Sequence, residues 1–168
     1  DIIGSHPEVS FFEHDMDLHR FYLARFNQDP IETPEERTNI IRLIAQNEKM
    51  HLLKADIDFD ELLKEIMGKV ELDIVEIIIN LLKSHAAYYS RPIWGLKEPL
   101  LEFYAPLLLK RYSNIRFVHM IRDPRDAYAS ARRLKWWNNF PDFLASWKES
   151  IELAKVLKDE FRQRVFIV

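Results

Sequence analysis

The residues best suited to chemistry are an arginine and a serine about two helical turns further along the chain. The stretch 115–121 is mostly apolar and ends at Arg122, which is followed by Asp123-Pro124 and then by Ser130. An arginine guanidinium is a planar fork of donors that matches a phosphate group. A helix that starts between the two residues would add N–H donors at its N-terminus. The pattern predicts a phosphate site with Arg122 and Ser130 as its ligands.

The local sequence indicates how this site would be held. A short apolar run between turn residues is typical of a strand buried on both faces, as in a parallel sheet. Asp123 is a favoured N-cap residue and Pro124 a favoured first helical residue, so a helix is predicted from Pro124 onward. Open α/β sheets bind ligands at the carboxyl ends of such strands. The plainer alternative is that Arg122 pairs with Asp126, or Arg125 with a nearby carboxylate, and that no ligand binds.

Two segments resemble the sulfotransferases that use 3′-phosphoadenosine 5′-phosphosulfate (PAPS). Residues 117–130 contain Arg-Asp-Pro-Arg-Asp after a predicted strand and a serine on the next helix, and they are similar to the family's 3′-phosphate-binding segment. Residues 94–99, Trp-Gly-Leu-Lys-Glu-Pro, are similar to the Trp-Gly-x-Lys-Thr-Pro element of its bacterial and Golgi-type members. By this resemblance, Arg122 and Ser130 bind the 3′-phosphate of the co-substrate.

The resemblance also implies residues for the transfer step. Lys97 corresponds to the lysine that lies near the transferring group in family members, where a cation stabilises developing negative charge. Glu98 stands where the family usually has Thr or Ser. It either brings a negative charge close to an anionic co-substrate or serves as the base for the acceptor. The plainer interpretation of Lys97 is a solvated residue at the end of a strand.

The implied function is sulfuryl transfer from PAPS to an alcohol, phenol or amine on a small molecule or a biopolymer. The alternative is a non-catalytic α/β module that binds a phosphorylated nucleotide or a partner protein through the same strand end. A kinase-like phosphoryl transferase is disfavoured because the chain has no Walker lysine and no clear strand-end aspartate for Mg²⁺. Nothing in the sequence names the acceptor, because acceptor pockets are built from variable loops.

One element of the family has no counterpart in this sequence. The chain has 3 glycines, and none belongs to a Gly-x-x-x-x-Gly-Lys-Ser/Thr phosphate loop, the kind of element that wraps the 5′-phosphosulfate. Residues 1–9 resemble the end of the family's first helix and a His-Pro turn, and residues 165–168 resemble a strand without a cap. We therefore expect an internal fragment of the domain that is incomplete for catalysis. The alternative is a protein that has lost its phosphate loop.

Several classes of function are disfavoured by composition. A net charge of −3 and the lack of a recognised module argue against nucleic-acid binding, although residues 132–137 mix basic and aromatic side chains. The tryptophans there would pack or line an acceptor pocket. The chain has no cysteine for disulfide or thiolate chemistry and no long apolar run to span a membrane, and we expect a cytoplasmic location. His14 and His19 lack the i, i+4 spacing of a zinc helix, so no metal site is expected, although His14 could be an acceptor-side base.

The expected fold is a single, partial, helix-rich α/β domain over residues 1–168, a three-layer αβα sandwich with a parallel sheet. The resemblance implies the P-loop-type sulfotransferase version of this fold. Capping boxes are predicted at Thr33 and Asp58. Trp147 is assigned to the buried face of its helix. Strands are predicted at 93–97, 115–121 and 165–168. Helices are predicted at 11–26, 33–53, 58–68, 73–89, 98–112, 124–133 and 143–161.

Overall fold

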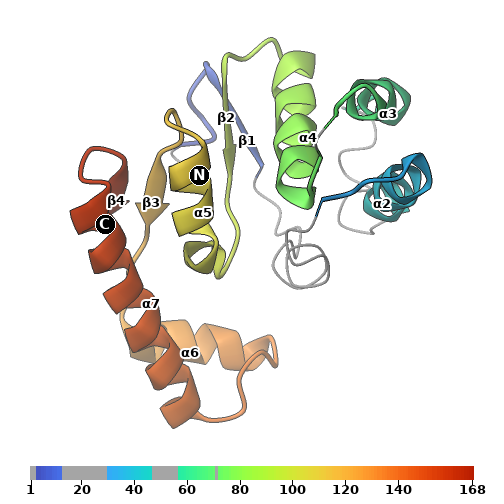
Figure 1. Ribbon diagram of the computed structural model, residues 1–168. Helices are drawn as coiled ribbons and strands as arrows, with labels where there is room; N and C mark the ends of the chain where they lie inside the picture. The colour runs from blue at the N-terminus through green and yellow to red at the C-terminus, as the bar shows by residue number, and fades with distance from the viewer. Residues whose placement is uncertain (1–2, 13–29, 47–56, 71) are drawn as a thin grey trace. The chain divides into compact units, whose positions relative to one another are not determined.

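The computed structural model describes residues 3–12, 30–46, 57–70 and 72–168, in which two or three helical segments separate one short strand from the next (Figure 1). The chain divides into two compact units, Asp1–Pro99 and Leu100–Val168, which are described one by one. The described residues of each unit contain one pair of parallel strands. The α/β class and the parallel pairing are therefore confirmed, while the three-layer sandwich and the single domain stay predictions.

In the first unit, a pair of parallel strands packs against one apolar helix. Strand β1 (Val9–Phe12) pairs with β2 (Ile93–Leu96), with Val9 opposite Ile93. Helix α4 (Ile74–Tyr88) contacts both strands (Figure 1). Most of its residues are buried, which confirms the buried helix predicted at 73–89. Its apolar side chains and the buried Val9 and Phe12 of β1 form part of the core of this unit.

A buried polar pair joins β1 to α4. The Ser10 hydroxyl lies 2.7 Å from Nδ1 of His85, and both side chains are buried. The His85 ring also meets the Phe12 ring edge-on, with the centroids 5.2 Å apart. Because an unpaired buried hydroxyl would lower stability, this hydrogen bond helps to hold strand and helix together.

Helices α2 (Pro34–Gln46) and α3 (Phe59–Met67) begin where the capping patterns predict. Glu36 accepts the N–H of Thr33 at 3.1 Å, and the Thr33 hydroxyl accepts the N–H of Glu36 at 3.2 Å. The Asp58 carboxylate accepts N–H groups of the first turn of α3. These bonds satisfy backbone donors that have no partner inside the helix, which fixes both helix starts.

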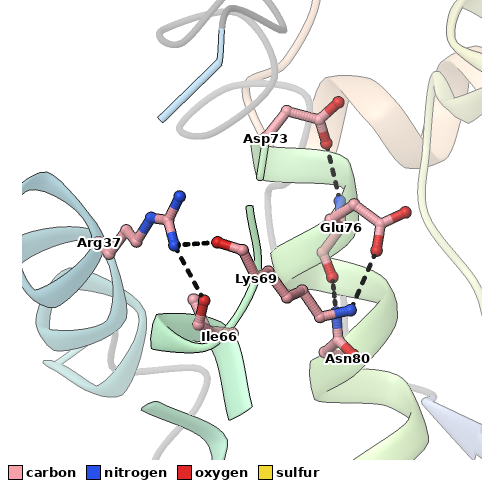
Figure 2. A network of polar contacts seen from close by, with 6 residues as sticks. All are labelled: Arg37, Ile66, Lys69, Asp73, Glu76 and Asn80. Atoms are coloured by element: carbon pink, nitrogen blue, oxygen red, sulfur yellow. Dashed lines mark hydrogen bonds and ion pairs between the residues drawn. The ribbon is translucent and has the colours of Figure 1, made fainter. Parts of the chain in front are cut away.

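A buried arginine binds α2 to the end of α3 (Figure 2). Arg37 is 6% exposed, and Nη1 donates to the carbonyl oxygens of Ile66 at 3.2 Å and Lys69 at 2.6 Å. Its Nε donates to the carbonyl of Ile31 at 3.1 Å. Carbonyls at a helix C-terminus lack partners within the helix and carry partial negative charge. Arg37 therefore acts as a cationic cap supplied by a neighbouring helix.

The same turn is tied to α4 (Figure 2). Nζ of Lys69 lies 3.5 Å from a carboxylate oxygen of Glu76. The N–H of Glu76 donates to Asp73, and its carbonyl accepts from the buried Asn80 side chain. The connection from α3 to α4 is thus held by main-chain contacts on one side and an ion pair on the other.

The second unit has two strands and four helical segments. They are η3 (Leu101–Phe103), α5 (Ala105–Arg111), β3 (Phe117–His119), α6 (Pro124–Arg133), α7 (Phe140–Glu160) and β4 (Val165–Ile167). Strands β3 and β4 are parallel. The core is made by Ala105, Leu109, Leu157 and Val165. Helix α7 runs from this core to the region beside α6 (Figure 1), so one helix connects both ends of the unit.

Two helix predictions are wrong at their starts. The helix predicted at 11–26 fails there because Phe11 and Phe12 lie in β1, where parallel pairing with β2 buries the Phe12 ring. Residues 13–26 lie outside the described part of the chain, as do residues 47–53 at the end of another predicted helix.

The helix predicted at 98–112 also starts too early. Leu100 adopts a left-handed conformation with φ of 63°, which breaks the helical path, and Pro106 lies in the first turn of α5 instead of bending a longer helix. The strands at 93–97, 115–121 and 165–168 are present but shorter than predicted, while α6 is confirmed over its full predicted length. None of the helices in the described ranges is long and apolar enough to cross a bilayer.

Candidate anion-binding and transfer residues

The strand pair of the second unit leads the chain directly to Arg122. Beyond the last paired residues, the N–H of Ile121 donates to the carbonyl of Val168 at 2.7 Å. The N–H of Val168 donates to the carbonyl of His119 at 3.0 Å. Parallel pairing therefore continues to the residue before Arg122. Arg122 lies at the carboxyl end of a parallel strand, as the sequence predicts.

The start of α6 is closed by an internal ion pair. The Asp123 carboxylate accepts the N–H of Arg125 at 2.8 Å and two guanidinium hydrogen bonds from Arg125 at 3.0 and 2.7 Å. These bonds to the ionised carboxylate lower the pKa of Asp123 to about 2 and raise the pKa of Arg125. The N–H of Arg125, one of the helix N-terminal donors expected to face a ligand, is thus already bonded to Asp123. Because Arg125 neutralises Asp123, the cap does not repel an anion beside it.

Arg122, unlike Arg125, forms no ion pair with a carboxylate of the described residues. Its side chain is exposed, and its guanidinium makes no hydrogen bond or ion pair with any residue in the described ranges. The pairing of Arg122 with Asp126, which the sequence left open, is not found there. The Arg122 carbonyl accepts a hydrogen bond from Nε1 of Trp147 at 3.2 Å. The backbone is therefore anchored while the charged group stays available to a ligand.

Ser130 lies within α6 and is half-buried. Its hydroxyl donates to no residue that the structure describes, whereas the hydroxyl of Thr38 in α2 bonds the carbonyl of Pro34 at 2.9 Å. A hydroxyl without such a local bond keeps its donor for another partner. The rise from Asp123 to Ser130 is about 10 Å. Because this interval is close to two helical turns, Ser130 lies on nearly the same side of α6 as Asp123.

Lys97 and Glu98 follow β2 in the first unit and differ in exposure. The N–H of Lys97 donates to the carbonyl of Phe12 at 3.2 Å, so strand pairing continues to Lys97. The Lys97 side chain is exposed, and its ammonium group has no partner among the described residues. Glu98 is only 9% exposed. Lys97 is therefore accessible to an anion, whereas a buried Glu98 is the weaker candidate for a base that meets an acceptor.

A close approach between β1 and β2 shapes the segment before Lys97. Gly95 lies opposite Phe11, and the Phe11 ring covers the glycine so closely that an added Cβ atom would lie 2.5 Å from Cδ2 and 2.8 Å from Cε2. Only glycine fits beneath the ring without a shift. The sequence alone gave no sign of this contact.

The other candidates have more limited roles. His14 and His19 lie outside the described residues, and among the residues that the structure describes there is no group of three His, Asp or Glu side chains that could hold a metal ion. His119 is buried beside Phe117, with the ring centroids 6.2 Å apart, and belongs to the packing of β3. The Trp137 ring packs edge-on against Phe143, with the centroids 5.9 Å apart. This packing is one of the two roles that the sequence suggested for the tryptophans at 136–137.

Comparisons with known proteins bear on the whole chain. The model of the sulfotransferase family matches residues 1–168. Neither the comparison with curated proteins nor that with solved structures gave a match. The family match extends well beyond the two motifs at 94–99 and 117–130, and it agrees with the α/β architecture. The chain belongs to the sulfotransferase family.

Proposed function

We propose that this protein transfers a sulfuryl group from PAPS to a hydroxyl or amine acceptor, and that Arg122 and Ser130 bind the 3′-phosphate. The availability of Arg122 is the observation that carries this proposal. Its guanidinium is exposed and has no partner among the described residues, while the adjacent Arg125 is held by Asp123. An unpaired arginine at the carboxyl end of a parallel strand suits a doubly charged anion.

Lys97 is the residue proposed to assist the transfer. As the sulfuryl group leaves the phosphate, negative charge develops on the bridging and sulfuryl oxygens. A cation near these oxygens stabilises the transition state more than the ground state. The exposed ammonium group of Lys97 can do this because no described carboxylate neutralises it. Glu98 remains a proposed base for the acceptor, although its burial favours a supporting role.

The first test compares the affinities of adenosine 3′,5′-bisphosphate and adenosine 5′-monophosphate by calorimetry. We expect the unmodified protein to prefer the bisphosphate, because only this nucleotide carries the 3′-phosphate. Arg122→Ala should reduce the preference about tenfold or more, the size expected for a charged hydrogen-bonded contact. Arg125→Ala is the matched control. It should change the preference less than Arg122→Ala does, because it removes no phosphate ligand and acts only by leaving the Asp123 carboxylate without its ion pair.

Equal affinity of the unmodified protein for the two nucleotides would contradict the proposed role of Arg122 and Ser130. Circular dichroism of both variants shows whether α6 is retained, so that a folding defect is not mistaken for a lost contact. A transfer assay on the full-length protein, with radiolabelled PAPS and a panel of alcohols, phenols and amines, then tests catalysis. Selective binding without transfer to any acceptor would favour the non-catalytic nucleotide-binding module.

A further inference from the structure

Trp147 of helix α7 forms a hydrogen bond with the backbone of Arg122. Nε1 of Trp147 donates to the Arg122 carbonyl at 3.2 Å, across 25 residues of sequence. It is the one hydrogen bond of Arg122 found within the described part of the chain. The contact falls between the last strand-pairing bond, at Ile121, and the Asp123 cap. The backbone is therefore held before, at and after Arg122.

The helix that carries Trp147 is fixed at both of its ends. Near its N-terminus, Phe143 is buried against Tyr128 of α6, with the ring centroids 5.4 Å apart. Near its C-terminus, Leu157 packs into the core with Val165 of β4. Trp147 follows Phe143 by four residues and so lies on the same side of α7. Since α7 is anchored to α6 and to β4, the indole N–H is presented from a rigid support.

We infer that Trp147 is a positioning residue for the anion site. Its N–H fixes the peptide of Arg122 so that the long side chain starts from a defined point beside α6. An arginine has high rotamer freedom, and a fixed backbone reduces the disorder that a ligand must remove on binding. The inference rests on the proposed function, because it needs Arg122 to bind the phosphate. Trp147 itself need not touch the ligand.

The test uses Trp147→Phe, which keeps an aromatic ring on α7 and removes the N–H donor. We expect the preference for adenosine 3′,5′-bisphosphate over adenosine 5′-monophosphate to fall about twofold to tenfold, the range expected for one neutral hydrogen bond. Trp137→Phe is the matched control. Trp137 lies in the same part of the unit, contacts Phe143 by its ring and donates no hydrogen bond to any described residue. It should leave the preference unchanged.

A double-mutant cycle separates positioning from a general structural role. If Trp147 acts through Arg122, Trp147→Phe should have no further effect on the nucleotide preference in an Arg122→Ala background. An unchanged preference in the single variant, or an equal loss of affinity for both nucleotides, would overturn the inference and leave the proposed function intact. If the unmodified protein shows no preference, the proposed function fails and the role of Trp147 fails with it.

Discussion

Gly95→Ala is a severe test of the packing between the two strands of the first unit. The added methyl group would lie 2.5 and 2.8 Å from two carbons of the Phe11 ring. Optimal carbon–carbon contacts are about 3.5–4.0 Å, so the ring must turn away. Phe11 is the direct partner of Gly95 in the register, so the shift must be taken up where the two strands pair.

The expected cost is that of overpacking, about 1–3 kcal/mol of unfolding free energy. For a protein of this size, each kcal/mol lowers Tm by about 2–4 °C, so the expected loss is about 2–12 °C. Urea denaturation gives the free energy and differential scanning calorimetry gives Tm. Shortening the opposing ring with Phe11→Leu should restore part of the loss, because the two sites are in contact and their effects are not additive.

Gly68→Ala is the matched control for this prediction. A Cβ atom at Gly68 would lie 3.6 Å from the nearest heavy atom, the Glu65 carbonyl oxygen, which is an ordinary contact. The φ of Gly68 is −77°, a value that alanine adopts freely. Alanine at this position should leave the free energy of unfolding unchanged or raise it by about 0.4–1 kcal/mol, because alanine lowers the conformational entropy of the unfolded chain. A Gly95→Ala variant as stable as Gly68→Ala would refute the steric argument.

Two further predictions concern charged groups. Lys97→Ala should lower kcat for sulfuryl transfer by about a hundredfold or more, whereas the affinity for adenosine 3′,5′-bisphosphate should change little. The reason is that a cation at the transferring group acts mainly in the transition state. An equal effect on binding and kcat would argue against this role. The pKa of Asp123 is lowered from 3.8 to about 2. The ionised Asp123 carboxylate therefore stabilises the folded protein fully above pH 3.8, and this stabilisation is lost as the pH falls toward 2. A carboxyl titration followed by NMR should show this midpoint, and Arg125→Gln should raise it toward the ordinary value; a midpoint near 3.8 in the unmodified protein would contradict the ion pair.

The elements governed by local rules were predictable from sequence. The segment from Asp123 to Arg133 has an N-cap residue, a proline at the first helical position and no helix breaker, and α6 has the predicted bounds. Asp58 and Thr33 likewise cap the helices they were expected to cap. Hydrogen bonds within three or four residues decide such starts, so sequence spacing contains the information needed.

The elements that depend on distant partners were not predictable in this way. Phe11 and Phe12 have aromatic side chains that suit a helix or a strand, and pairing with β2, some 80 residues later, decides the outcome. The periodicity of α7 predicts Trp147 in the core, but its side chain is only partly buried and donates to the carbonyl of Arg122, an acceptor that periodicity cannot name. The charge of Arg122 was evident from sequence, whereas the choice of Asp123 by Arg125, and the lack of an ion pair of Arg122 with any described residue, were not.

The hydrogen bonds of Arg37 to the end of α3 constrain how this part of the chain can evolve. Within the described ranges, every hydrogen bond from its guanidinium ends on a main-chain oxygen, in Ile31, Ile66, Lys69 or Val70. A main-chain oxygen is present whichever amino acid occupies the position, so exchanges at the exposed Val70 leave the acceptor in place. An insertion or deletion would instead shift the oxygens away from the guanidinium. In relatives that keep this arginine, the turn should vary freely in residue type and very little in length.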